Sequence, residues 1–257
     1  MFLDSKYLLI KLMKKQAVFI DIDGCLTPGK NLSIPWEEVK ALQEAFKQYE
    51  DYFEYIIVTA RPATYAEAVV QFLGLMDTEK HKHAICESGG VCHLFGSDTY
   101  TVSSAVDPEV LNSFESTLRR LQSVYKYNIE DGRKRTINML PAKGESPRGL
   151  GILLKEYLPE GLEMHNSAGG IDITPSKIDK AVACRELAEK AGINLEESVA
   201  IGDSGGDLPL LKIVGHPSCP ANAFPSVQEI VTEKSGYIAK AKFGFGVVEI
   251  LEHYYQS

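Results

Sequence analysis

The chain has 257 residues, which is enough for one large domain or two smaller ones with a buried core. A composition of 44% hydrophobic and 24% charged residues argues against disorder, and no stretch approaches the roughly 20 apolar residues of a membrane span. The formal net charge of −8 argues against nucleic acid or an anionic membrane as the main partner.

Cysteine usage and the N-terminus both favour a cytoplasmic protein. The five cysteines are odd in number and widely spaced without a CxxC pair, so neither a disulfide framework nor a zinc site is predicted. Residues 1–15 carry an acid at Asp4 and two lysines at their end. Because this order is the reverse of a secretory signal, we expect no such signal.

The first predicted strand, residues 17–20 (AVFI), ends in an unusual way. Four apolar residues are typical of a strand buried on both faces. Asp21 and Asp23 follow directly, with Gly24 behind them. A buried carboxylate is costly unless a cation or hydrogen-bond donors meet it, so these two acids predict partners elsewhere in the chain.

Strands and helices alternate as far as residue 90. Such alternation predicts a parallel sheet with helices on its faces. The predicted strands span residues 17–20, 55–59 and 83–86, and the predicted helices span residues 33–49 and 65–73.

The pattern changes after residue 90, where hairpins replace crossover helices. Helices at 108–124 and 146–158 alternate with hairpins at 124–140 and 161–175. The first hairpin turns at Asp131-Gly132 and the second at Ala168-Gly169-Gly170, both of them turn sequences. This αββαββ order predicts an antiparallel sheet covered on one face by two helices.

The alternating pattern then returns. Its predicted elements are helices 178–191, 207–214, 225–231 and 245–254 and strands 198–202 and 216–219. We therefore assign residues 1–90 and 174–257 to a core and residues 91–173 to an inserted cap domain. The expected fold class is α/β, a Rossmann-like parallel-sheet core with an inserted α+β cap.

Polar residues at the ends of separate predicted strands suggest one ligand site. In an open parallel sheet, ligands bind at the carboxyl ends of the strands. The candidates are Asp21, Asp23, Thr59, Lys180, Asp203 and Asp207. Carboxylates with waters and phosphate oxygens suit Mg²⁺, and a phosphate would be repelled by these acids without that cation and the Lys180 ammonium.

This set suits phosphoryl transfer. An ionised Asp21 can attack phosphorus and form an aspartyl-phosphate. Asp23, two residues on, emerges on the same side of an extended chain, where it can protonate the leaving group and then activate water. Thr59 supplies a hydroxyl donor for a phosphoryl oxygen, and Lys180 supplies positive charge. Lys177 is interpreted as an exposed neighbour.

Four segments together resemble the motifs of the haloacid dehalogenase phosphatase superfamily. They occur in the family's order as DIDGCLT (21–27), VTAR (58–61), PSKIDK (175–180) and IGDSGGD (201–207). The resemblance implies a haloacid dehalogenase core with Asp21 as nucleophile and Asp23 as acid and base. It also implies Mg²⁺ held by Asp21, the backbone carbonyl of Asp23 and Asp203, with Asp207 in or near that shell.

The position of the insert resembles that of the Cof-type and sugar-phosphate phosphatases. The segment HPSCPANA (216–223) is similar to the archaeal-type phosphoglycolate phosphatases. Ala60 departs from the usual glycine of the second motif, and Ser88 stands where Cof-type members often have asparagine. The implied substrate is a small phosphorylated metabolite such as phosphoglycolate or a sugar phosphate. We expect the protein to be a monomer or a homodimer.

Alternatives stay open at this point. A phosphomutase uses the same aspartyl-phosphate, and a phospho-accepting regulatory module also groups aspartates, threonine and lysine around Mg²⁺. Arg61 either binds substrate or anchors its loop. Arg135 is a candidate substrate-binding residue, although its charge run with Arg133 and Lys134 follows a hairpin turn, where such runs are usually solvated.

Overall fold

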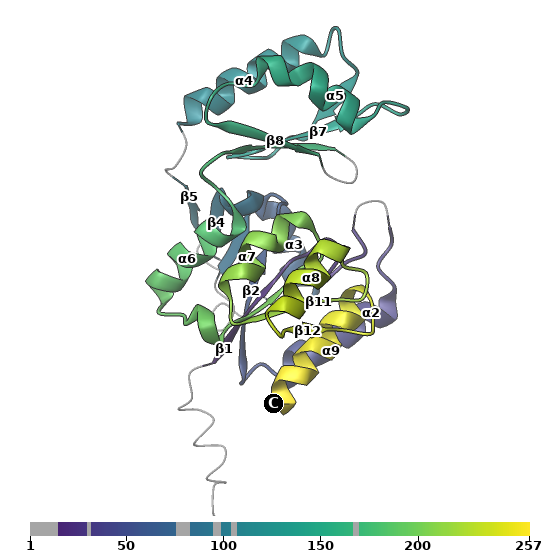
Figure 1. The fold of residues 1–257 in the computed structure, drawn as a ribbon, viewed down its shortest axis with the longest axis vertical. Helices are drawn as coiled ribbons and strands as arrows, with labels where there is room; N and C mark the ends of the chain where they lie inside the picture. Colours follow the sequence, from purple (N-terminus) through teal and green to yellow (C-terminus); the bar gives the residue numbers. More distant parts are fainter. Residues whose placement is uncertain (1–14, 30–31, 76–82, 95–98, 104–106, 167–169) are drawn as a thin grey trace, which may run out of the picture.

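The structure is a computed structural model that describes residues 15–29, 32–75, 83–94, 99–103, 107–166 and 170–257. It consists of a core built on an eight-stranded sheet and a cap built on a four-stranded sheet (Figure 1). Residues 1–14, where the absence of a secretory signal is expected, lie outside the described part. No helix in the described ranges has the length and hydropathy needed to cross a bilayer.

The core sheet has the strand order β12-β11-β10-β1-β2-β3-β4-β5. Pairing is parallel from β12 to β3, as the alternating pattern predicts. The strands are β1 (Gln16–Ile20), β2 (Phe53–Val58), β3 (His83–Cys86), β4 (Val91–Leu94), β5 (Thr99–Val102), β10 (Val199–Ile201), β11 (His216–Cys219) and β12 (Tyr237–Ile238).

Strands β4 and β5 are a departure from the predicted domain boundary. They continue the core sheet as an antiparallel hairpin on the edge of β3, with Ile85 opposite Cys92 and Val91 opposite Val102. Val91 is buried in the core cluster. Residues 91–94 and 99–102 therefore lie in the core sheet, because the chain that follows β3 covers the edge that β3 would otherwise leave unpaired, and the cap begins later than residue 91.

Helices cover both faces of the core sheet. Alternate residues of β1 point to opposite faces, with Val18 and Ile20 in one apolar cluster and Ala17 and Phe19 in the other. The first cluster packs under α2 (Trp36–Gln48), α3 (Ala63–Phe72) and α9 (Phe243–Gln256), and the second under α6 (Lys180–Ala191), α7 (Leu208–Ile213) and α8 (Pro225–Glu233). Burial on both faces explains why β1 is continuously apolar over residues 17–20.

The cap has the predicted αββαββ order. Its sheet, β6-β7-β9-β8, is antiparallel throughout, and Figure 1 shows both helices on the face turned away from the core. Its elements are α4 (Pro108–Leu121), β6 (Tyr127–Ile129), β7 (Ile137–Pro141), α5 (Pro147–Leu154), β8 (Leu162–Asn166) and β9 (Ile171–Pro175). Phe114 and Leu118 pack on Ile137 and Ile171 in a separate apolar cluster. The predicted turn residues Ala168 and Gly169 lie outside the described ranges.

Candidate active site

Asp21 stands at the carboxyl end of β1 and is held there by the neighbouring strand. Its backbone N–H donates to the carbonyl of Ile201 at 3.0 Å, and the residue is only 6% exposed. Gly24 follows with φ of +88°, and a Cβ at this position would overlap the carboxylate of Asp203. A glycine is required here because the backbone turns in the left-handed region and passes directly against another acid.

Lys180 joins two of the acids. Its Nζ lies 2.9 Å from Asp21 Oδ1 and 2.6 Å from Asp207 Oδ1, and all three side chains are almost fully buried. The lysine is the first residue of α6, whose N-terminus is capped by Asp179 accepting from the N–H of Val182 at 2.7 Å. Residues that are more than 150 positions apart in the chain are thus brought into direct contact.

The charges of this cluster are only partly balanced. Burial alone would lower the pKa of Lys180, but the carboxylates of Asp207 and Asp21 more than offset it, so the pKa is raised. Burial, with the charges of Asp207 and Asp203, raises the pKa of Asp21 despite Lys180. Burial and the Asp207 charge raise the pKa of Asp203 to about 7. Three carboxylates against one ammonium leave an excess of negative charge that favours a bound cation.

The donor set fits a divalent cation. One carboxylate oxygen each from Asp21, Asp203 and Asp207 lie within 4.8 Å of one another. Asp203 Oδ1 is buried and, among the described residues, has no hydrogen-bond partner. A buried carboxylate oxygen without a donor is costly, and hard oxygen ligands are what Mg²⁺ prefers, so the site suits that ion.

Both carboxylate oxygens of Asp207 accept hydrogen bonds from other residues of the chain. Oδ1 accepts from Lys180, and Oδ2 accepts from the N–H groups of Asp203 and Ser204 at 3.1 and 3.0 Å and from the Ser204 hydroxyl at 3.2 Å. The carboxylate therefore shapes the turn after β10 and fixes the lysine. This geometry favours Asp207 as a residue that supports the metal site over one that enters its first coordination sphere.

Asp23 points away from this cluster and toward Arg61. The guanidinium Nε and Nη2 each lie 2.6 Å from one Asp23 oxygen, and the carbon of the guanidinium lies 4.5 Å from the centre of the Tyr65 ring. Burial alone would lower the pKa of Arg61, but the hydrogen-bonded carboxylate of Asp23 outweighs it and raises the pKa. Among the predicted metal residues, the Asp23 side chain is thus outside the group formed by the other three.

The other predicted site residues are placed as follows. Thr59 is fully buried at the end of β2, where its hydroxyl accepts from the N–H of Arg61 at 3.0 Å. Arg135 is in the cap, with Nη1 donating to the carbonyl of Lys134, and its Nε is buried without a partner among the described residues. Lys177 is exposed, as predicted. Arg133 is not solvated, since its side chain is 5% exposed.

Two further residues support the site without having been singled out from sequence. Asn222 donates from Nδ2 to the carbonyl of Gly24 at 2.8 Å and accepts from the N–H of Phe243 at 2.8 Å. Glu87 follows β3 and is 1% exposed. An acid directly after a buried strand is the same signal that identifies Asp21, so Glu87 was accessible to this reasoning, whereas Asn222 has no local signal.

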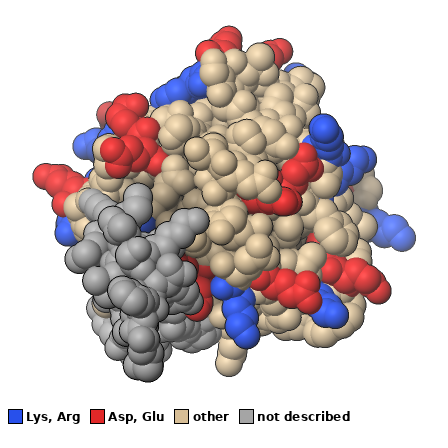
Figure 2. All heavy atoms as spheres, turned by 90° about the horizontal axis from the view of Figure 1, so that it is seen from below, with Lys and Arg blue, Asp and Glu red and all other residues tan. Residues whose placement is uncertain are grey.

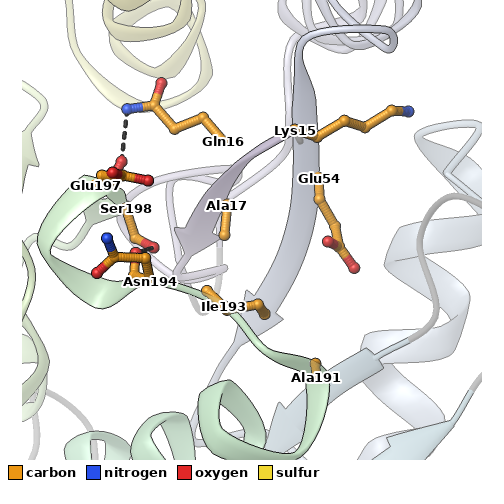
Figure 3. Close-up of a pocket in the computed structure, with 9 residues that line it drawn as sticks. All are labelled: Lys15, Gln16, Ala17, Glu54, Ala191, Ile193, Asn194, Glu197 and Ser198. Carbon is orange, nitrogen blue, oxygen red and sulfur yellow. Dashed lines mark hydrogen bonds between the residues drawn. The ribbon is translucent and has the colours of Figure 1, made fainter. Parts of the chain in front are cut away.

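A separate hollow lies at the opposite end of β1. It has a volume of about 260 Å³ and is lined by residues that include Gln16, Glu54, Asn194 and Glu197 (Figure 3). Gln16 Nε2 donates to the carbonyl of Glu197 across it at 2.7 Å. Acidic and basic side chains are interspersed around this end of the molecule, on the part that the structure describes (Figure 2). None of the residues grouped around Asp21 lines this hollow.

Comparisons with known proteins find hydrolases that are similar to this chain. The family profile of the haloacid dehalogenase-like hydrolases matches residues 152–242. A phosphoglycolate phosphatase of Methanobrevibacter smithii is 28% identical over 94% of this chain and 99% of its own, and one of Methanothrix thermoacetophila is 26% identical over 93% and 96%. Both therefore align along almost their full length.

Solved structures share the fold. Thermoplasma acidophilum 0175 superposes with a TM-score of 0.73 at 19% identity, covering 95% of this chain and all of that one. The sucrose-phosphatase of Synechocystis, solved with sucrose and phosphate, has a TM-score of 0.67 at 16% identity, covering 94% and 98%. At these identities the structural likeness concerns the arrangement of core and cap.

Proposed function

We propose that this chain, which belongs to the haloacid dehalogenase superfamily, is a Mg²⁺-dependent phosphatase that hydrolyses the phosphate monoester of a small metabolite through an aspartyl-phosphate on Asp21. The main observation in support is the contact of Asp21 with Lys180, beside the Asp203 oxygen that has no hydrogen-bond partner among the described residues. This arrangement combines a buried nucleophile, a fixed positive charge and a cation ligand at one strand end.

The first step would transfer the phosphoryl group. Lys180 holds one oxygen of the Asp21 carboxylate, and the other attacks phosphorus while the bond to the leaving oxygen breaks. Asp23 gives its proton to that oxygen, which leaves as an alcohol. Mg²⁺, held by Asp21, Asp203 and the backbone carbonyl of Asp23, would neutralise the phosphate charge and keep it next to the carboxylates.

The second step would hydrolyse the acyl phosphate. Asp23, now ionised, accepts a proton from a water that attacks phosphorus, the bond from phosphorus to the Asp21 oxygen breaks, and inorganic phosphate is released. Because Arg61 occupies both Asp23 oxygens, Asp23 must leave this pair before it can carry a proton. A substrate anion that competes for the Arg61 guanidinium would release it, which supports Arg61 as a substrate-binding residue.

The substrate class rests on the relatives. Phosphoglycolate is the first candidate because relatives bearing that activity in their names align over almost the whole chain, and sugar phosphates are the second. Thr59 and Lys180 would hold the phosphoryl oxygens, and Arg135 of the cap would contact the remainder of the substrate. The described cysteines are all free, which supports a cytoplasmic location.

The test is a screen for release of inorganic phosphate. Purified protein is incubated with phosphorylated metabolites, including phosphoglycolate and sucrose 6-phosphate, with Mg²⁺ or with EDTA. We expect phosphate release with Mg²⁺ and none with EDTA. In Asp21→Asn we expect the rate of phosphate release to fall at least about 1,000-fold, because the amide cannot act as the nucleophile.

The alternatives give different readouts. Isomerisation of a sugar phosphate without net phosphate release would indicate a phosphomutase, and a stable phosphoprotein without turnover would indicate a phospho-accepting module. Asp131→Asn is a matched control, because Asp131 is an exposed cap residue paired with Arg119. Wild-type turnover by Asp21→Asn would contradict the mechanism.

A further inference from the structure

The cap is seated on the core by a buried carboxylate. We propose that Glu87 is a positioning residue: it holds the cap loop of residues 133–136 and, through this loop, the backbone of residues 59–61 at the phosphate site. The contacts of Glu87 are independent of any activity, and their consequence for catalysis rests on the proposed function.

The Glu87 carboxylate is an acceptor for successive donors of the cap. The N–H of Lys134 lies 2.9 and 3.0 Å from its two oxygens. Oε2 also accepts from the N–H of Arg135 at 2.7 Å and from the N–H and hydroxyl of Thr136 at 3.0 and 3.2 Å. Three consecutive amides converging on one carboxylate form an anion-binding nest, here closed by a residue from another domain.

The backbone of this residue is unusual for its type. Glu87 and Ser88 have φ of 50° and 56°, in the left-handed region, and neither is a glycine. Such residues persist where the surroundings over-determine them, and they concentrate at functional sites. Here the conformation turns the chain after β3 so that the carboxylate, 1% exposed, meets the cap.

The same segment holds the loop that follows β2. The N–H of Ser88 donates to the carbonyl of Thr59 at 3.1 Å, and the N–H of Glu87 donates to the carbonyl of Arg61 at 3.0 Å. The intervening carbonyl, of Ala60, accepts from Arg133 Nη1 of the cap at 2.8 Å. Three successive carbonyls are thus held, two by the core and one by the cap.

This arrangement links the cap to the acid of the site. Arg133 also donates to the Glu130 carboxylate at 2.6 and 2.8 Å and to the Thr136 hydroxyl at 3.0 Å. The loop that contacts Ala60 is therefore the same loop that binds the Glu87 carboxylate. Arg61, at the end of the held segment, carries the guanidinium that binds Asp23. Loss of the Glu87 carboxylate is therefore expected to free the cap loop. The contact of this loop with the Ala60 carbonyl would then weaken, and with it the backbone that orients Arg61.

Gly90 makes the close seating possible. Its φ and ψ of −70° and −23° are accessible to any residue, but a Cβ there would lie 2.7 Å from the Cβ of Arg135. The same Cβ would lie 3.2 Å from the backbone carbonyl oxygen of Glu87. Gly90→Ala is therefore a steric probe that displaces the cap loop while keeping the Glu87 carboxylate.

The experiment is hydrogen exchange followed by mass spectrometry on the full chain without substrate. In Glu87→Ala we expect the peptide over residues 133–137 and the peptide over residues 59–62 to exchange at least about tenfold faster than in the wild type. Glu87→Gln, which keeps one acceptor oxygen, is expected to be intermediate, and Gly90→Ala to resemble Glu87→Ala. Glu189→Gln, an exposed change on α6, is the matched control and is expected to match the wild type.

The outcomes separate the parts of the proposal. Unchanged exchange in both peptides overturns it, and faster exchange over 133–137 alone overturns the positioning of residues 59–61. Continued protection of α4 from exchange shows that the cap stays folded. If Glu87→Ala unfolds the cap, the exchange of the same two peptides in Gly90→Ala tests the proposal instead. For any substrate found in the screen, kcat/KM is expected to fall more than tenfold in both variants. A chain with no phosphatase activity would refute the proposed function and leave the exchange result as the test of the seat.

Discussion

Lys180 is a buried ammonium that contacts two of the three carboxylates grouped around it. Its 4% exposure removes it from water, so its charge is stabilised by Asp21 and Asp207 and theirs by it. Lys177, three residues earlier, is exposed and shares only its residue type. The two lysines therefore separate the effect of a paired, buried charge from that of a surface charge.

We expect Lys180→Met to lower the free energy of unfolding by about 3 kcal/mol without metal, because it leaves buried carboxylates without their cation. Phosphatase activity is expected to fall by at least about 100-fold, as for loss of a charged group that stabilises the transition state. Urea unfolding in EDTA and a phosphate-release assay measure these effects. Lys177→Met should remain within about 0.5 kcal/mol of the wild type, and equal losses in both variants would refute this account.

At the scale of elements, the beginning of α6 decides where the ammonium lies. Asp179 caps the helix and Lys180 is its first residue, so a frayed first turn would displace the lysine. The cap helix α4 begins in the same way, with Asp107 accepting from the N–H of Glu109 at 2.9 Å, but it carries none of the charged residues of the site.

Asp179→Ala and Asp107→Ala should each cost about 1 kcal/mol of stability, the usual effect of losing an N-cap acceptor. Only Asp179→Ala is expected to lower kcat, because only this helix positions Lys180. Urea unfolding and steady-state kinetics on both variants provide the comparison. An equal fall in kcat for the two would show that helix capping at α6 has no special part in the site.

Glu249 ties α9 to the chain after β12 and makes the stability of this element depend on pH. It accepts from the N–H groups of Lys240 and Ala241 and from the Tyr237 hydroxyl. Burial alone would raise the pKa of Glu249, but these donors lower it below its ordinary value. A lowered folded-state pKa contributes stability above the unfolded-state value, and this contribution is lost as the pH falls through the folded-state value.

Glu249→Gln is therefore expected to cost about 1 kcal/mol at pH 7, and the difference from the wild type should disappear as the pH falls through the lowered folded-state pKa of Glu249. Urea unfolding at pH 7 and at a pH low enough to protonate Glu249 in the folded chain measures both. Glu229→Gln, an exposed change on α8, is the control and should follow the wild type at each pH. A difference that persists at the lower pH would rule out this ionisation as its cause.

At the scale of the whole molecule, a cation would join elements from both ends of the chain. The acids that fit it follow β1 and β10, which are neighbours in the sheet although they lie far apart in sequence. A ligand that binds the folded chain alone stabilises all of it by mass action.

Magnesium at about 100 times its dissociation constant should add about 2.7 kcal/mol and raise the Tm by about 5–10 °C in a chain of this size. Differential scanning calorimetry after EDTA treatment, with and without Mg²⁺, measures the shift. Asp203→Asn is expected to abolish most of it, because the amide carries no negative charge and replaces one of the two carboxylate oxygens with an NH2 group that cannot bind a cation. A shift of the same size in this variant would place the ion elsewhere.

Much of the fold is encoded in short windows of sequence. Period-two and apolar runs identify the strands, and Asp131-Gly132 identifies a hairpin, because these depend on neighbours within a few residues. The residues that form β4 and β5 are instead assigned to the insert from sequence alone. Which sheet a hairpin joins depends on the free edge of β3, and no local property of residues 91–102 contains that information.

The sequence by itself determined which residues have unusual chemistry: the acids after buried strands, the threonine after β2 and the lysine at the start of a helix. Only the tertiary structure decided their partners. Asp23 meets Arg61, Lys180 bridges Asp21 and Asp207, and Glu87 receives the cap. The physical reason is that burial makes each isolated charge costly, while the group that relieves the cost is chosen by the folding of distant segments onto one end of a sheet.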